Sequence, residues 1–220
     1  MQRLAMKLQP GESLYMSYQD YLGLATESGQ LLEWVNGEVV VHMPPKPRHQ
    51  EIVGFVFALL HVFVRFRRLG KLYMAPIEMR LAELGISREP DILFVAQGNL
   101  ARVTETRVDG PADLVVEVIS DDSVARDRAD KFYEYQAAGV GEYWIIDPRP
   151  GRERADFWTL DREGKYRAET LDESGIYHSP SLPGFWLNVA WLREAELPNP
   201  LLLFAQIAGL PPELAEVLNT

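Results

Sequence analysis

The chain has 220 residues, of which 47% are hydrophobic, as expected for one globular domain with additions at its edge. It contains no cysteine, which excludes a disulfide framework and a thiolate zinc site. The formal net charge of −10 argues against a protein that coats nucleic acid electrostatically, but not against an enzyme that acts on it. Basic residues concentrate between positions 46 and 71, either as a surface that attracts phosphate or as cations that complement a helix dipole.

The sequence predicts no membrane-spanning segment. Its longest apolar run, residues 52–64, is shorter than the roughly 20 residues that cross a bilayer. The first residues lack the long apolar core of a signal peptide. We therefore expect no membrane attachment and a cytoplasmic location, with which the lack of cysteine is compatible.

Two helices are expected in the first third of the chain. Residues 13–27 place apolar side chains at broadly helical spacing, and Gly29 ends the segment. A basic connector rich in proline then leads into residues 49–69, which are apolar on nearly every face in the middle of the segment. A helix of this kind is buried, either under a sheet or at a subunit interface.

A β-hairpin is predicted between these helices. Residues 31–35 and 38–42 flank an Asn-Gly pair, which is the strongest short-range signal for a two-residue turn. Glu33 and Glu38 lie in the hairpin and are interpreted as solvated strand positions rather than as groups near a cleft.

The rest of the chain reads as an α/β protein. The remaining elements are expected at 71–83 (strand), 90–95 (strand), 97–110 (irregular or partly helical), 114–120 (strand), 123–138 (helix), 142–147 (strand), 154–160 with 165–171 (hairpin), 176–189 (strand or edge segment), and 201–208 with 211–218 (two short helices). Two prolines and a change in composition separate the last two helices from the rest. We therefore expect a domain over residues 1–192 and an apolar helical extension over 193–220 that docks on the domain or on a second subunit.

One carboxylate stands out because it interrupts an apolar strand. Glu117 lies inside the run from Leu114 to Ile119, which has the pattern of a buried strand. A buried carboxylate without a partner costs several kcal/mol or becomes protonated, so this position needs a metal, a cation or a wet cleft. Glu117 therefore predicts a site at this point of the sheet.

Two further residues can meet this carboxylate. Asp91 precedes another apolar run, after a proline that suits the start of a strand. Lys131 lies on the helix predicted over 123–138 and shares one face with Asp127 and Tyr135. Two carboxylates bind Mg²⁺ or Mn²⁺, and an ammonium group stabilises developing negative charge, so the set suits hydrolysis of a phosphodiester. A salt bridge between Glu117 and Lys131 or an arginine is the structural alternative.

The residues also carry a resemblance to a known family. The matching positions are Pro90-Asp91, Glu117-Val118-Ile119, Asp127, Lys131, Tyr135, Gly139 and the string Glu142 to Asp147. This pattern resembles the Uma-two family of restriction-endonuclease-like proteins, a branch of the PD-(D/E)xK nuclease superfamily. The likeness extends over residues 18–189 and is strongest over 90–147. It implies a restriction-endonuclease-like fold, a mixed β-sheet flanked by helices, here with an added hairpin.

The resemblance also implies a function and a set of site residues. It implies an endonuclease that cleaves DNA with Mg²⁺ or Mn²⁺, and a homodimer by analogy. The superfamily lysine normally lies two residues after the glutamate, where this chain has Ile119, so the lysine is expected to have moved to Lys131 on the following helix. The resemblance implies Asp91 and Glu117 as metal ligands, together with the main-chain carbonyl of Val118. It suggests that His49, at the start of its helix, approaches the site, and a capping or surface histidine is the alternative. Asp127 and Tyr135 are accessory candidates because they share the helix face of Lys131.

A protein without catalytic activity remains the alternative. The missing strand lysine and the acidic net charge favour a binding or assembly protein that keeps the nuclease fold. A serine hydrolase or a zinc hydrolase is disfavoured, because the chain has no G-x-S-x-G and no H-E-x-x-H.

Overall fold

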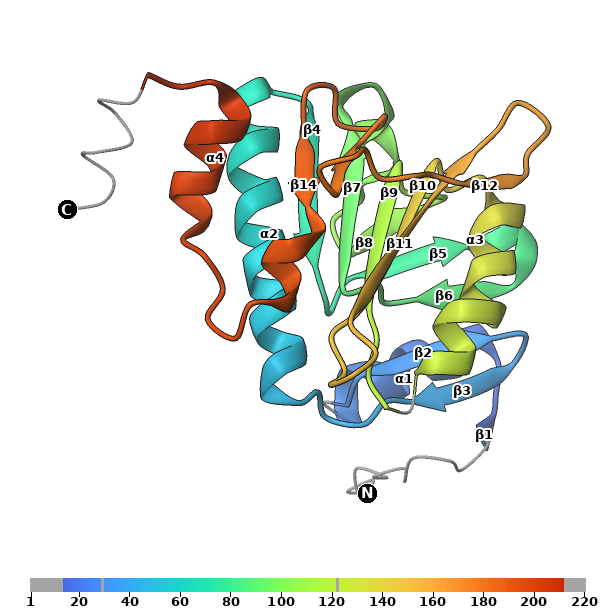
Figure 1. Ribbon diagram of the computed structural model, residues 1–220. Helices are drawn as coiled ribbons and strands as arrows, with labels where there is room; N and C mark the ends of the chain where they lie inside the picture. The colour runs from blue at the N-terminus through green and yellow to red at the C-terminus, as the bar shows by residue number, and fades with distance from the viewer. Residues whose placement is uncertain (1–13, 29, 122, 212–220) are drawn as a thin grey trace.

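The computed structural model of the protein describes residues 14–28, 30–121 and 123–211, and it contains two large mixed sheets flanked by helices (Figure 1). The central sheet has the order β12-β11-β10-β9-β7-β4. Its strands are β4 (Gly70–Met74), β7 (Ile92–Ala96), β9 (Leu114–Val118), β10 (Glu142–Asp147), β11 (Arg154–Leu160) and β12 (Tyr166–Ala168). The fold is therefore the mixed α/β class that the sequence predicts.

The two middle strands of the central sheet, β9 and β10, run parallel and are buried along their whole length. Both are rich in β-branched and aromatic residues, as strands covered on two faces usually are. Alternation along β9 sends Leu114, Val116 and Val118 into one core and Val115 into the other. Glu117 follows the same alternation and faces the side of Val115.

Helices cover both faces of this sheet. The face of Val116 packs against α2 (Pro47–Arg67), and α4 (Pro200–Ala208) packs on the outside of α2. The other face packs against α3 (Lys131–Ala138) and against the second sheet. Helix α2 is long and apolar enough to cross a membrane by length and composition alone, but half of its most apolar stretch is buried inside the protein. The interpretation of residues 49–69 as a helix buried under a sheet is therefore confirmed.

The second sheet is built around the predicted hairpin. Its order is β1-β3-β2-β6-β5-β8. Its strands are β1 (Leu14–Tyr15), β2 (Leu32–Val35), β3 (Glu38–Val41), β5 (Glu78–Leu81), β6 (Ile86–Arg88) and β8 (Arg107–Asp109). Asn36 and Gly37 both have positive φ angles, of 50° and 96°, as the predicted turn requires. Helix α1 (Tyr18–Ser28) packs on this hairpin through Tyr21, which is fully buried.

Several predicted elements differ in detail. The strand expected over 71–83 is divided into β4 and β5, because Pro76 lies between them and cannot donate to a ladder. The segment 97–110, expected to be irregular or partly helical, contains a 3₁₀ helix (Gln97–Arg102) and also β8. The final strand is a pair of short antiparallel strands, β13 (Ile176–His178) and β14 (Trp186–Asn188). The helix predicted over 211–218 lies outside the described residues after Pro211.

The predicted helix over 123–138 has two parts. A π-helical turn (Arg126–Asp130) precedes α3, and Gly139 ends α3 in the left-handed conformation, with φ of 85°. Single π turns are often found at functional sites. Here the π turn carries Asp127, and Lys131 is the first residue after it. The unusual turn therefore lies where the helix approaches Glu117.

Candidate active site

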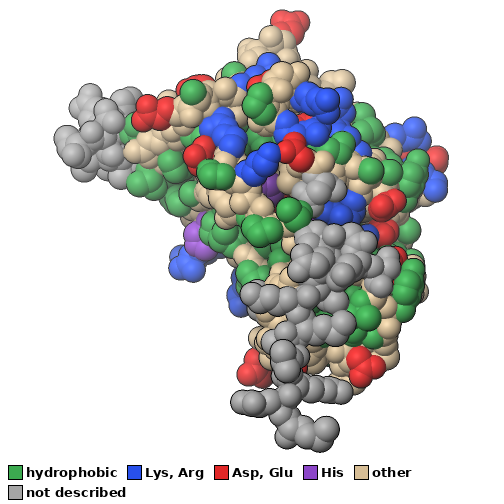
Figure 2. Space-filling view, turned by 90° about the horizontal axis from the view of Figure 1, so that it is seen from below, with side chains coloured by type: hydrophobic (Ala, Val, Ile, Leu, Met, Phe, Trp, Pro, Cys, Tyr) green, Lys and Arg blue, Asp and Glu red, His purple; other side chains and the backbone are tan. Residues whose placement is uncertain are grey.

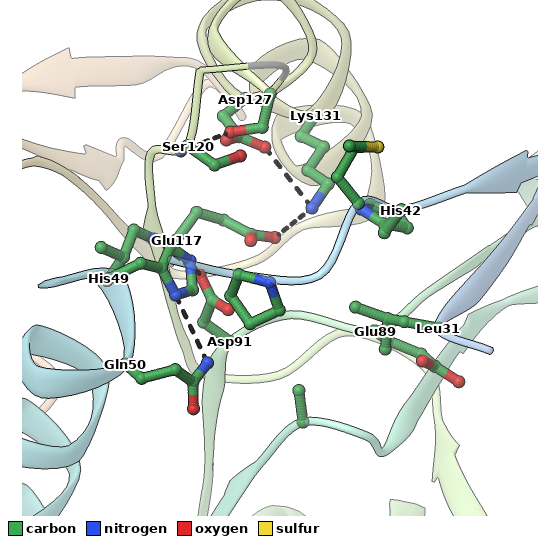
Figure 3. A pocket seen from close by; sticks show the side chains of 15 residues that line it. Leu31, His42, His49, Gln50, Glu89, Asp91, Glu117, Ser120, Asp127 and Lys131 are labelled. Atoms are coloured by element: carbon green, nitrogen blue, oxygen red, sulfur yellow. Dashed lines mark hydrogen bonds and ion pairs between the residues drawn. The ribbon is translucent and has the colours of Figure 1, made fainter. Parts of the chain in front are cut away.

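The predicted central group, Glu117, lies near the end of β9 and is 3% exposed. Its Oε1 accepts a hydrogen bond from the Lys131 ammonium at 2.7 Å and another from the Tyr135 hydroxyl at 2.8 Å. Figure 3 shows the Glu117 carboxylate between Lys131 and Asp91. The structure therefore brings the strand carboxylate and the helix lysine together, as the sequence predicts.

Lys131 is surrounded by carboxylates. In addition to Glu117, its Nζ lies 3.4 Å from Glu33 Oε1 and 3.5 Å from Asp127 Oδ1. The side chain is 2% exposed, so solvent screens these charges little. Burial lowers the pKa of Lys131, but the Glu117, Glu33 and Asp127 carboxylates outweigh it and raise that pKa above its usual value. The ammonium group therefore stays charged at neutral pH.

The prediction that Glu33 is a solvated strand residue is wrong. Glu33 is 0% exposed on β2, and its Oε2 accepts from Arg88 at 2.8 Å and lies 2.9 Å from His42 Nε2. Its Oε1 accepts from the main-chain N–H of Glu89 at 3.0 Å. Burial raises the pKa of Glu33, but the charges of Lys131 and Arg88 outweigh it and hold that pKa well below its usual range. Through its ion pair with Lys131, Glu33 therefore connects α3 to the second sheet.

Asp91 occupies the opposite end of the cluster. Its Oδ2 accepts from the main-chain N–H of Val118 at 2.8 Å and lies 3.3 Å from His49 Nε2. Burial lowers the pKa of His49, but the Asp91 carboxylate outweighs it, and a bond to the Val118 main chain adds to the upward shift. His49, on the first turn of α2, therefore lies beside both Asp91 and the Val118 main chain. This places the expected accessory histidine in the cluster.

Part of this cluster lines one small pocket with a volume of about 90 Å³ (Figure 3). Asp91, Glu117, Asp127 and Lys131 all contribute to its wall, and so does Glu89. Lys131 is the lone Lys or Arg side chain in that wall among the described residues. Carboxylates therefore outnumber fixed cations inside the pocket by four to one.

This excess of negative charge shifts two carboxyl groups. Burial raises the pKa of Glu117 to about 8 even with Lys131 beside it, and the Asp127, Asp91 and Glu33 charges contribute to the rise. Burial and the Glu33 charge raise the pKa of Glu89 to about 8 as well. Within the described part of the chain, Glu89 Oε2 is buried without a hydrogen-bond partner. Such a group is stabilised by a cation that enters the pocket.

The pocket fits a divalent cation bound by oxygen atoms. Among the described residues, no group of three or more His, Asp or Glu side chains is placed to hold a metal ion. A metal site here would therefore combine Asp91 and Glu117 with water and a main-chain carbonyl, for which Val118, in the pocket wall, is the predicted candidate. Hard cations such as Mg²⁺ bind carboxylate and carbonyl oxygen and keep several waters. The raised pKa of Glu117 and the unpartnered Glu89 oxygen both favour added positive charge.

Sequence reasoning missed four residues of the cluster. They are Glu33, His42, Arg88 and Glu89. Arg88 is buried and also forms a two-pronged contact with Glu134, at 2.8 and 2.7 Å. The charged pair Arg88-Glu89 directly before the Pro90-Asp91 motif was the available signal, because charges that flank a buried strand need partners.

The fold is shared with a protein of known structure. A solved structure described as a "putative nuclease belonging to DUF820" from Anabaena variabilis ATCC 29413 has a TM-score of 0.66 and 16% identity. The match covers 81% of this chain and 97% of the other. No curated protein matches the chain.

The family is shown by the sequence itself. A sequence model of the Uma2 family, described as "Putative restriction endonuclease", matches residues 18–190. This range includes every residue of the pocket. The chain therefore belongs to the Uma2 family, which confirms the resemblance drawn from the motif residues.

Proposed function

We propose that the protein is a metal-dependent endonuclease that hydrolyses phosphodiester bonds of DNA. The observation that carries this proposal is the convergence of Asp91, Glu117 and Lys131 on one pocket that holds more carboxylates than cations. Membership of a restriction-endonuclease-like family supports the reaction class. The choice of DNA as substrate rests on the family alone.

Each residue has a distinct part in this proposal. Asp91 and Glu117 bind Mg²⁺ or Mn²⁺, together with the main-chain carbonyl of Val118. The metal, when bound, supplies Lewis acidity toward a phosphate oxygen and lowers the pKa of a bound water. Lys131 keeps its proton and stabilises the negative charge that develops on phosphate as water attacks. Its contact with Glu117 Oε1 holds the ammonium beside the metal ligands.

The accessory residues orient this machinery. Tyr135 donates to the same Glu117 oxygen as Lys131 and so fixes the rotamer of the carboxylate. Asp127 lies one turn before Lys131 and holds the ammonium from the helix side. His49 contacts Asp91 and restricts its orientation toward the pocket. Preorganised contacts of this kind reduce the reorganisation that the reaction requires.

Assembly and location are also proposals. Cleavage of both strands of a duplex needs two active sites, which supports a homodimer. The α4 extension within residues 193–220 packs on α2 and leaves Phe66 and Leu201 exposed, which supports a docking role for that part of the chain. The lack of cysteine supports a cytoplasmic location.

A nicking assay on supercoiled plasmid tests the reaction class. Wild-type protein with Mn²⁺ or Mg²⁺ is expected to relax the plasmid, and Asp91→Asn is expected to leave it supercoiled because one metal ligand loses its charge. EDTA should stop the reaction of the wild type. Nicking that persists in both Asp91→Asn and EDTA would contradict the proposal.

One observation favours the non-catalytic alternative. Glu117 Oε1 is already occupied by two donors, Lys131 and Tyr135, so the carboxylate has a structural partner without any metal. A binding protein that keeps the fold would bind no Mn²⁺ and nick no plasmid, yet remain folded. The same assay, combined with a metal titration, therefore separates the two functions.

A further inference from the structure

A second groove opens directly from the catalytic pocket. It has a volume of about 340 Å³ and shares His49 and Ser120 with that pocket. It lies between the start of α2 and the turn that follows β10. A polynucleotide with one phosphate beside Asp91 can therefore continue into this groove.

Two proline-stiffened turns form the walls of the groove. One wall consists of Lys46, Pro47 and Arg48, the other of Pro148, Arg149 and Pro150, and the floor of Ile119, Ser120 and Asp121. Proline has a fixed φ angle, so each wall holds its cation on a rigid backbone. Most of the lining is apolar, with charge confined to the edges. This is the chemistry of a surface that contacts a sugar and a base as well as a phosphate.

Three cations line the groove on a chain of net charge −10. They are Lys46, Arg48 and Arg149, and the lining includes the carboxylate of Asp121. From outside the groove, Asp147 binds Arg149 at 2.8 Å and Glu51 lies 3.3 Å from Arg48. Lys46 pairs with Asp121, but their side chains are 73% and 63% exposed, and such pairs contribute little. A phosphate can therefore replace Asp121 as the partner of Lys46. Figure 2, seen from below, shows several Lys and Arg side chains on this face, with Asp and Glu side chains among them.

The other wide groove beside the site has the opposite character. Its volume is about 590 Å³, and it lies along α3 and the hairpin. It is lined by three carboxylates, Glu38, Asp130 and Glu134, against Arg88 and Arg126. Arg88 is itself buried and paired with Glu33. Carboxylates outnumber cations in the lining of this groove, whereas cations outnumber carboxylates in the lining of the groove of Lys46, so the path of a nucleic acid is expected on the side of Lys46.

We propose that the proline-walled groove binds the nucleotide next to the scissile phosphate of a single nucleic-acid strand. The proposal rests on the proposed nuclease function. Lys46 and Arg149 contact the backbone phosphate, and the prolines and Ile119 contact the sugar and base. The bound nucleotide is expected to be unstacked from its neighbours, because stacked bases would leave the apolar lining of the groove without a partner.

Binding of a fluorescein-labelled dT12 oligonucleotide, followed by anisotropy in Ca²⁺, tests this groove. Lys46→Glu is expected to weaken binding by about tenfold and to lower the slope of log affinity against log salt by about one. Lys46→Arg should stay within about twofold of wild type, because the charge is kept. The control is Lys165→Glu, an exposed lysine in the β11–β12 turn, which should leave dT12 affinity unchanged. Equal losses in Lys46→Glu and Lys165→Glu would overturn the proposal.

Photo-crosslinking gives the location independently of affinity. A dT12 that carries 4-thiothymidine is expected to crosslink to peptides containing residues 44–50 or 147–152. Crosslinks confined to residues 125–134 would overturn the proposal. Loss of plasmid nicking with the Lys46 dependence intact would refute the nuclease function but keep the groove. Nicking with binding that does not depend on Lys46 would refute the groove alone.

Discussion

Two buried glutamates on neighbouring parallel strands have opposite surroundings. Glu142 begins β10, is 0% exposed and accepts four hydrogen bonds. The donors are the Trp144 indole, the hydroxyls of Tyr177 and Ser179, and the main-chain N–H of Ser181. Glu117, near the end of β9, has an ammonium on one oxygen and carboxylates nearby. Neutral donors satisfy both oxygens of Glu142. Glu117, in contrast, lies in a pocket with an excess of negative charge.

This difference distinguishes a carboxylate with a structural role from one that can bind a cation or a proton. A carboxylate fully bonded to neutral donors is stable where it is and has no free oxygen to offer a ligand. A carboxylate with a raised pKa in a pocket is available to a cation or a proton. The pair therefore allows a matched comparison inside one sheet.

The largest expected effect is the difference in cleavage between the same substitution, Glu to Gln, at positions 117 and 142. Glu117→Gln should lower metal-dependent cleavage by at least about a hundredfold, because a charged metal ligand is lost. Glu142→Gln should leave cleavage unchanged but destabilise the fold by about 1–3 kcal/mol, because two donors would face an amide N–H₂. Plasmid cleavage and urea unfolding measure the two effects. Equal loss of cleavage in both variants would remove the distinction.

Replacement of the buried ammonium should affect both chemistry and stability. Lys131→Met leaves Glu117, Glu33 and Asp127 without their shared cation, which costs about 3–5 kcal/mol for a broken buried ion pair. Cleavage is expected to fall by about a hundredfold, because charge stabilisation at the phosphate is lost. Mn²⁺ should restore part of the stability by supplying positive charge to the pocket. A variant of wild-type stability with full activity would contradict the role of Lys131.

A smaller effect is expected at Glu33, which positions Lys131. Glu33→Gln should lower kcat by about tenfold with little change in Mn²⁺ affinity, because the lysine moves and the metal ligands do not. The control is Glu134→Gln, which removes a partner of the same Arg88 on the solvent side of the network. That variant should keep the wild-type kcat. Similar kcat losses in both variants would show that Arg88 pairing, and not the position of Lys131, is responsible.

A further effect, on stability and not on cleavage, is expected in its dependence on pH. Glu89 has a pKa of about 8 in the folded protein and a usual value of 4.5. A raised pKa means that the folded state binds the extra proton between these values, so the contribution of Glu89 to stability is full below about pH 4.5 and is lost as pH rises through about 8. Glu89→Gln should therefore gain stability relative to wild type between pH 5 and 8.5, measured by urea unfolding. A constant difference would contradict the raised pKa.

The sequence was sufficient to predict the residues that interrupt a regular pattern of apolar side chains. Glu117 could be found because a carboxylate inside an apolar strand is anomalous, and Lys131 because the helix after that strand packs back over it. The Asn-Gly hairpin was predictable from local turn chemistry. These features depend on neighbours close in the chain.

The sequence was insufficient where burial depends on distant packing. In the hairpin Glu33 looks like an ordinary solvated position, and it is buried because Arg88 and Lys131 arrive from segments 55 or more residues away. Glu142 begins a strand, where a charged residue is unremarkable, and its donors Tyr177 and Ser179 come from β13 and the residue after it. Alternation along a strand gives the face of a side chain but not what covers that face.

Titration calorimetry of Mn²⁺ at pH 8 tests the central claim most directly, because it asks whether Asp91 and Glu117 hold a divalent cation. Wild-type protein and Glu142→Gln are expected to bind one Mn²⁺ with the same affinity. Asp91→Asn and Glu117→Gln are expected to show no measurable binding while they remain folded by circular dichroism. Absence of Mn²⁺ binding in the wild type, or equal binding in all four proteins, would contradict a metal site in this pocket.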